Sequence, residues 1–128
     1  MKIRFALPVL ALGLLGLSAC GGGSSSTGGT VPADADVVVK AVEGIAWNAK
    51  SFTATATDGK VTIYGENDAS IGHNLYVLDA NDKVMGDAID LPSHGANGTR
   101  VLPLTPGTYH IVCKVPGHNN MNATLTVS

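Results

Sequence analysis

The chain of 128 residues is poor in the residues that several common functions require. It has two cysteines, too few for a disulfide-built scaffold or for the paired Cys motifs of a structural zinc site. Charged residues make up 14% of it and form no basic stripe, so nucleic acid is not expected as a partner. No catalytic triad, acid pair or phosphate-binding loop is present, so the chain is not expected to be an enzyme.

Long apolar runs are also missing, apart from one near the start. Residues 5–17 form an apolar run of 13 residues, shorter than the ~20 that a membrane-spanning helix needs. Lys2 and Arg4 precede this run, and the small residues Ser18 and Ala19 follow it. This order of a positive, an apolar and a small-residue segment is typical of a secretory signal.

The end of this segment, Leu-Ser-Ala-Cys at residues 17–20, resembles the bacterial lipobox. The resemblance implies that residues 1–19 are a lipoprotein signal peptide and that Cys20 is lipidated, which attaches the protein stably to a membrane. An ordinary secretory signal with an incidental cysteine is the alternative. The expected location is extracytoplasmic, on the periplasmic face of a bacterial membrane. Gly21 is not an acidic retention signal, so the outer membrane is compatible with the sequence, and both the inner and the outer membrane stay open.

A composition change separates this anchor from the rest of the chain. Residues 21–30 are all Gly, Ser or Thr, which form a flexible linker and bury no core. Residues 20–35 are therefore expected to comprise the lipidated cysteine and a linker. The remaining stretch, residues 36–128, is long enough for one small domain.

This domain shows the period of β-strands rather than of helices. Residues 60–64 and 124–127 alternate between apolar and polar, whereas residues 37–39 and 75–78 are predicted to be more fully buried. Turn sequences rich in Gly, Asn and Asp separate the runs. We predict an all-β, Greek-key β-sandwich of about seven or eight strands. Two aromatic residues are assigned to its core, Trp47 and Phe52.

Cys113 needs an explanation of its own. If Cys20 is acylated, Cys113 has no partner within the chain, and a lone thiol is a liability in an oxidising compartment. Burial as an inert core residue, an intermolecular disulfide and metal ligation are the alternatives. The nearby His118 and Met121 favour metal ligation.

These residues belong to a set with narrow chemistry. Cys113, His118 and Met121 lie within nine residues, on a loop bent by Pro-Gly, and His73 lies forty residues before Cys113. Two imidazoles, a thiolate and a weak thioether are the ligands of a blue-copper electron-transfer site. The strand before the loop places Cys113 on the inward face. His94 and His110 are expected to be a solvated loop residue and a strand-face residue, not ligands.

Residues 36–128 resemble a cupredoxin of the azurin and plastocyanin type. The resemblance depends on Gly-His-Asn at residues 72–74, Pro-Gly-Thr-Tyr at 106–109, Pro-Gly-His at 116–118, and Met121 before a closing strand. It implies one copper that cycles between Cu(I) and Cu(II). The implied ligands are His73, Cys113 and His118 with Met121 axial, assisted by a weak axial contact from the Gly72 carbonyl and by hydrogen bonds from Asn74.

The spacing differs from the family in one place. Only two residues separate His118 from Met121, one fewer than in azurins, which leaves Met121 the least constrained ligand. A His-x-x-Met spacing also occurs in the binuclear copper centre of cytochrome oxidase. That centre needs a second cysteine on the loop, and this loop has none.

The ligand set predicts a one-electron carrier that works as a monomer. The resemblance implies transient docking of redox partner proteins, such as a cytochrome, near His118. From Gly21 onward, six Lys and Arg stand against ten Asp and Glu, and this charge of −4 favours a partner with a positive docking surface. Copper delivery or storage without rapid redox cycling is the alternative function. A catalytic copper site would require an open position, for instance if Met121 did not coordinate.

Overall fold

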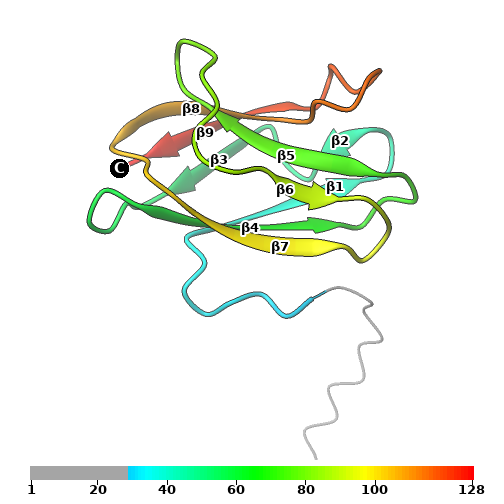
Figure 1. The fold of residues 1–128 in the computed structure, drawn as a ribbon, viewed down its shortest axis with the longest axis horizontal. Coiled ribbons are helices and arrows are strands. Elements are labelled where there is room, and N and C mark those ends of the chain that lie inside the picture. The colour runs from blue at the N-terminus through cyan, green and yellow to red at the C-terminus, as the bar shows by residue number, and fades with distance from the viewer. Residues whose placement is uncertain (1–28) are drawn as a thin grey trace, which may run out of the picture.

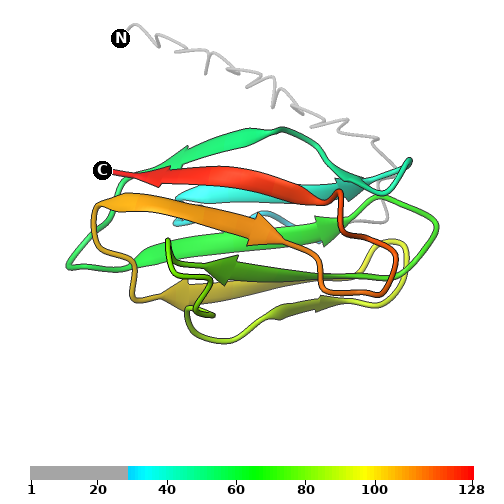
Figure 2. The same cartoon turned by 90° about the horizontal axis from the view of Figure 1, so that it is seen from above.

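Alternating apolar and polar residues produce nine strands, which form two sheets packed face to face (Figures 1 and 2). The structure is a computed structural model that describes residues 29–128. The predicted signal peptide and the predicted lipidation site at Cys20 lie outside the described residues. The domain boundary at residue 36 and the anchor therefore stay predictions.

The first sheet has the strand order β2-β1-β4-β7 and the second has the order β3-β9-β8-β5-β6. Two of the pairings are parallel, β1 with β4 and β3 with β9, and the others are antiparallel. The strands are β1 (Val37–Val42), β2 (Ala46–Trp47), β3 (Ser51–Ala54), β4 (Val61–Asn67), β5 (His73–Leu78), β6 (Ile89–Leu91), β7 (Asn97–Leu102), β8 (Gly107–Val112) and β9 (Asn122–Val127).

The core lies between the two sheets, where the inward residues of each strand meet. Strands β1, β5, β8 and β9 follow the period of two, with every second residue buried through most of their length. Trp47 is 6% exposed, and its indole N–H donates a 3.2 Å hydrogen bond to the carbonyl of Ile111 on the other sheet. This contact ties the short strand β2 to β8, the strand that ends just before Cys113.

The structure confirms the predicted all-β sandwich and corrects two details. Strands β2 and β6 have two and three residues, too short for a recognisable period, so the count is nine rather than seven or eight. Val38 and Tyr76, predicted within fully buried runs, are half-buried on the outer faces, because each sheet has only one covered face. Phe52 is half-buried and packs against the core.

No segment of residues 29–128 is a helix long and apolar enough to cross a membrane. The loop that carries most of the predicted ligands and three neighbouring loops gather at one end of the sandwich, at the right in Figure 1. We call this the ligand end. It comprises the β1–β2 turn (43–45), the β4–β5 loop (68–72), the β6–β7 loop (92–96) and the β8–β9 loop (113–121).

Candidate metal centre

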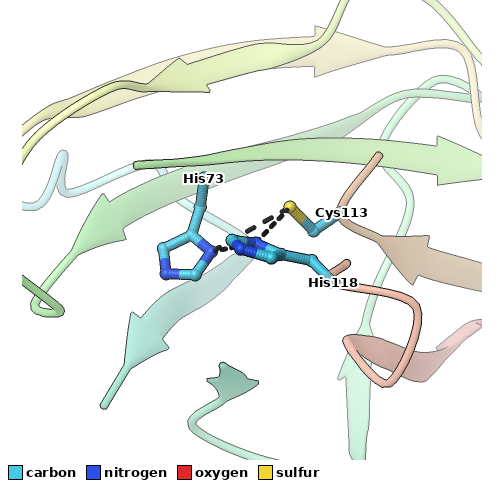
Figure 3. Close-up of side chains that lie close together, drawn as sticks. All are labelled: His73, Cys113 and His118. Atoms are coloured by element: carbon cyan, nitrogen blue, oxygen red, sulfur yellow. Dashed lines mark hydrogen bonds between the residues drawn. The ribbon is translucent and has the colours of Figure 1, made fainter. Parts of the chain in front are cut away.

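Three predicted ligands, far apart in the chain, meet at the ligand end (Figure 3). The Nδ1 atoms of His73 and His118 are 3.1 Å apart. The sulfur of Cys113 lies 3.5 Å from Nδ1 of His118 and 4.0 Å from Nδ1 of His73. Among residues 29–128, no other group of three or more His, Cys, Asp or Glu side chains is close enough to hold a metal ion.

This arrangement fits a single ion held by three bonds. Donor atoms that each lie about 2.0–2.3 Å from one metal are separated by distances of this size. All three side chains are buried: His73 is 3% exposed, Cys113 5% and His118 7%. A soft sulfur beside two imidazole nitrogens, held away from water, is the donor set that copper prefers.

The β8–β9 hairpin places two of the three donors. Val112 pairs with Asn122, and the ladder continues one step further, where the N–H of Cys113 donates to the carbonyl of Met121 at 3.2 Å. The loop between Cys113 and Met121 contains a tight turn, in which the N–H of His118 donates a 3.0 Å hydrogen bond to the carbonyl of Val115. Pro at its second position and Gly117 at its third, with φ of 87°, are the residues that a type II turn requires.

Met121 lies next to Cys113 in this hairpin. Opposite residues of an antiparallel ladder project on the same face, so Met121 shares the inward face of Cys113, and it is 1% exposed. A second turn, closed by the N–H of Met121 on the carbonyl of His118 at 3.0 Å, accommodates the short spacing between them. The two-residue gap is therefore compatible with a buried Met121 beside Cys113 in the hairpin, and its role as a ligand stays a prediction.

Asn74 joins the two ligand-bearing segments, as the resemblance implied. Its backbone N–H points at the sulfur of Cys113 at 3.5 Å. Its side-chain oxygen accepts a 2.7 Å hydrogen bond from the N–H of Lys114. One residue thus orients the thiolate and closes the gap where the β5–β8 ladder ends.

Asn67 is a structural residue of the site that the sequence did not reveal. It is fully buried, and its amide donates to the carbonyls of Ile71 at 2.8 Å and Leu91 at 3.0 Å. Leu91 pairs with His73, so these bonds hold both sides of the His73 backbone. In the sequence, Asn67-Asp68 is typical of a turn. The one signal for a structural role is the position of an asparagine at the end of a strand.

The β1–β2 turn is a second contribution that the sequence did not show. The carboxylate of Glu43 accepts from the N–H of Ser70 at 2.7 Å, three residues before His73. The carbonyl of Ile45 accepts from the amide of Asn120 at 2.7 Å, next to Met121. The turn therefore contacts both ligand-bearing loops.

The electrostatics of the site favour a neutral imidazole at His73. Burial lowers the pKa of His73 below its usual 6.5, and the nearby His118 ring adds to the effect, while Glu43 acts weakly in the opposite direction. A neutral ring leaves a lone pair on Nδ1 for a metal. Its proton then lies on Nε2, which is buried and has no hydrogen-bond partner among the described residues.

The other predicted residues lie as follows. A side chain at Gly72 would approach the carbonyl of Pro92 to 2.8 Å, so the approach of the β6–β7 loop requires glycine there. The axial role of the Gly72 carbonyl stays a prediction. His94 is exposed and His110 is half-buried on a strand, and neither belongs to the metal-binding group.

The architecture matches solved structures closely enough to name the fold. An auracyanin from the photosynthetic bacterium Roseiflexus castenholzii matches with a TM-score of 0.61 at 19% identity, over 71% of this chain and 94% of that one. An azurin from the methylotroph Methylomonas sp. strain J matches with a TM-score of 0.59 at 19% identity, over 75% and 99%. The chain has a cupredoxin fold.

A third cupredoxin structure, auracyanin B, matches with a TM-score of 0.58 at 20% identity, over 81% of this chain and 95% of that one. No protein-family model and no curated protein matches the sequence. The likeness to known proteins is therefore one of three-dimensional structure, and His73, Cys113 and His118 meet at the ligand end of this fold.

Proposed function

We propose that the protein is a one-electron carrier with a single type 1 copper. The observation that carries the proposal is the buried group of His73, Cys113 and His118, with donor atoms 3.1–4.0 Å apart at one end of a cupredoxin fold. These three side chains would hold the copper, and the thioether of Met121 would supply a fourth, weaker bond. The bound copper supplies the redox chemistry, by accepting and returning one electron.

The chain itself supplies the conditions for that chemistry. Cys113 binds as a thiolate and the two histidines bind as neutral rings, so acid weakens metal binding. The hairpin ladder, the type II turn and the bonds of Asn74 fix the donors before the metal arrives. Fixed donors serve both oxidation states with little movement, and burial keeps water from the metal, so electron transfer is fast.

His118 is the proposed point of electron entry and exit. It is the most exposed of the four assigned ligands, at 7%, and it follows the exposed Pro116 and Gly117. Redox partner proteins, such as a cytochrome, would dock here on a small, transient interface. The net charge of −4 from Gly21 onward favours partners with a positive docking surface, and we propose a monomer.

Lipidation of Cys20 would place the carrier outside the cytoplasm, on a bacterial membrane. Support comes from the signal-like residues 1–19 and the Gly/Ser-rich residues that follow Cys20. The proposed organisation is then a signal peptide, an acylated linker over residues 20–35 and the cupredoxin domain over residues 36–128. Mass spectrometry of the membrane fraction tests the anchor, and an unmodified Cys20 would contradict it.

The visible spectrum of the protein loaded with Cu(II) tests the copper assignment. An intense thiolate-to-copper charge-transfer band is expected, bleached reversibly by a reductant and absent from the Cys113→Ser variant. A pale protein that prefers Cu(I) and gives it up readily to a chelator would instead favour copper delivery or storage. The exposed His94 offers a matched control, because His94→Ala should leave the band unchanged.

A further inference from the structure

The residues that precede β1 run back along the first sheet. At one end of this segment the N–H of Asp36 donates to the carbonyl of Thr62 at 2.8 Å, and the carboxylate of Asp36 accepts from the N–H of Thr62 at 2.7 Å. At its other end Gly29 lies against Asn97, so closely that a side chain at Gly29 would collide with the amide group. Thr62 is near the start of β4, whereas Asn97 pairs with Glu66 near its end.

Asn97 lies at the ligand end. The preceding residue, Ala96, accepts a 2.8 Å hydrogen bond from the N–H of Asn67. Asn67 in turn donates through its amide to Ile71, two residues before His73. The described chain therefore begins beside the loops that hold the metal site, and it enters the domain from that side (Figure 1).

The C-terminus leaves from the opposite end. Strand β9 runs away from the ligand loop, and Ser128 is held by the bond from its N–H to the carbonyl of Ala54 at 2.9 Å. The six residues of β9 alone span about 20 Å, so Ser128 lies at the other end of the sandwich from Gly29, the first described residue.

We infer that the N-terminal tether presents the ligand end to the membrane surface, so that the redox partner is a protein seated in that membrane. This inference depends on the proposed function, since it needs both the anchor and the copper. Eight residues lie between Cys20 and Gly29, and the taut length from Cys20 to Gly29 is about 30 Å. The tether thus keeps the ligand end near the lipid, whereas a tether at Ser128 would hold it a domain length further away.

The surface chemistry of the two ends agrees with this orientation. In the four loops of the ligand end, the charged residues are Glu43, Asp68 and Lys114, which leave a net charge of −1. Ile71, also there, is 44% exposed and gives the surface an apolar contact. The opposite end has four aspartates and two lysines in residues 57–60 and 79–87, and an anionic lipid surface repels that excess of negative charge.

The test compares two attachments of the same copper-loaded chain on phosphatidylcholine vesicles. In the first, the chain from Cys20 onward is coupled through Cys20 to a maleimide lipid, while Cys113 is protected by burial and by copper. In the second, Cys20 is replaced by Ser, and the sequence of residues 21–30 followed by one cysteine is added after Ser128. Each reduced protein gives one electron either to ferrocenium carried on a lipid, which becomes ferrocene, or to soluble ferricyanide, which becomes ferrocyanide.

The expected result is a faster reaction with ferrocenium lipid for the attachment through Cys20, by about tenfold, because the tether raises the local concentration of the site at the membrane. Ferricyanide should oxidise both forms at the same rate. Equal rates with ferrocenium lipid would overturn the inferred orientation while leaving the carrier function intact. Failure of both forms to reduce ferricyanide would overturn the proposed function instead.

A variant tests the role of the packed segment directly. In Gly29→Leu the new side chain displaces the amide group of Asn97 from its contact with residue 29, so the tether should detach from the ligand end and lengthen. The preference for ferrocenium lipid should then fall toward that of the C-terminal attachment, with the spectrum and the ferricyanide rate unchanged. A preference that stays at the full value in Gly29→Leu would contradict the packing of Gly29 as its cause.

Discussion

The side chain of Asn74 accepts a 2.7 Å hydrogen bond from the backbone N–H of Lys114, next to Cys113. The two residues lie forty positions apart, and the bond takes the place of the next rung of the β5–β8 ladder. It joins the segment that carries His73 to the segment that carries Cys113. The distance between these two segments, and with it the geometry of the ligands, therefore depends on the side-chain amide of Asn74.

Replacing Asn74 by Ala should therefore loosen both segments. The loss of this hydrogen bond should lower the free energy of unfolding by about 0.5–1.5 kcal/mol, and the charge-transfer band should shift because the sulfur is less tightly held. Urea unfolding and the spectrum of the copper-loaded protein measure the two effects. Asn119→Ala, at an exposed residue of the ligand loop, is the control and should change neither.

Asn67→Asp should show whether the His73 backbone needs the amide donor. An aspartate keeps an acceptor for the N–H of Ala69 but cannot donate to Ile71 and Leu91. Leaving these carbonyls without a donor should lower the free energy of unfolding by about 1–3 kcal/mol. The affinity for copper should also fall, because the His73 backbone is less firmly held. Stability and affinity that both match the wild type would show that His73 is held by its strand pairing alone.

The type II turn predicts a specific requirement for glycine at residue 117. Gly117→Ala meets no neighbouring atom, but its φ of 87° disfavours any side chain by about 1–2 kcal/mol. The turn should open and His118 should move, which weakens copper binding. Gly107→Ala is the matched control, because a side chain there meets only ordinary contacts and φ is not positive.

Met121→Leu separates the carrier from an open catalytic site. If the thioether of Met121 is the axial ligand, the variant should remain coloured and its reduction potential should change, measured by titration against a redox mediator. The buried volume is nearly conserved by Leu, so the fold should stay intact. An unchanged potential would indicate that the thioether is not bound and that the axial position is open.

Tyr64 predicts a loss of stability in alkali that is independent of the metal. Burial, reinforced by the carboxylate of Glu66, raises the pKa of Tyr64 from 10.0 to about 12. Because the raised value belongs to the folded state, the protonated phenol stabilises the fold below about pH 10, and this contribution is lost as the pH rises toward 12. The free energy of unfolding should fall less steeply above pH 10 in Tyr64→Phe than in the wild type.

Tyr76→Phe is the control for that measurement, because Tyr76 is half-buried on the other sheet and stacks with Lys114. Both variants lose one phenol, so a difference between their slopes belongs to the surroundings of Tyr64. Parallel slopes for Tyr64→Phe and the wild type would show that the phenol of Tyr64 does not couple to folding.

Local chemistry in the sequence was enough to predict a β-sandwich and most of the centre. Period-two alternation depends on neighbouring residues, and so do the Pro-Gly turn and the short spacing of Cys113, His118 and Met121. These features act over a few residues, and the structure bears out the fold that they predicted. The structure likewise places His73 with Cys113 and His118.

Contacts between distant segments were decided only by the tertiary structure. Asn67 and the β1–β2 turn support the ligand loops through hydrogen bonds to residues that the sequence places elsewhere, and the path of residues 29–36 depends on the surface of the first sheet. Strand register and the approach of loops arise when two sheets pack over one core. Their energies belong to pairs far apart in the chain, which no local pattern records.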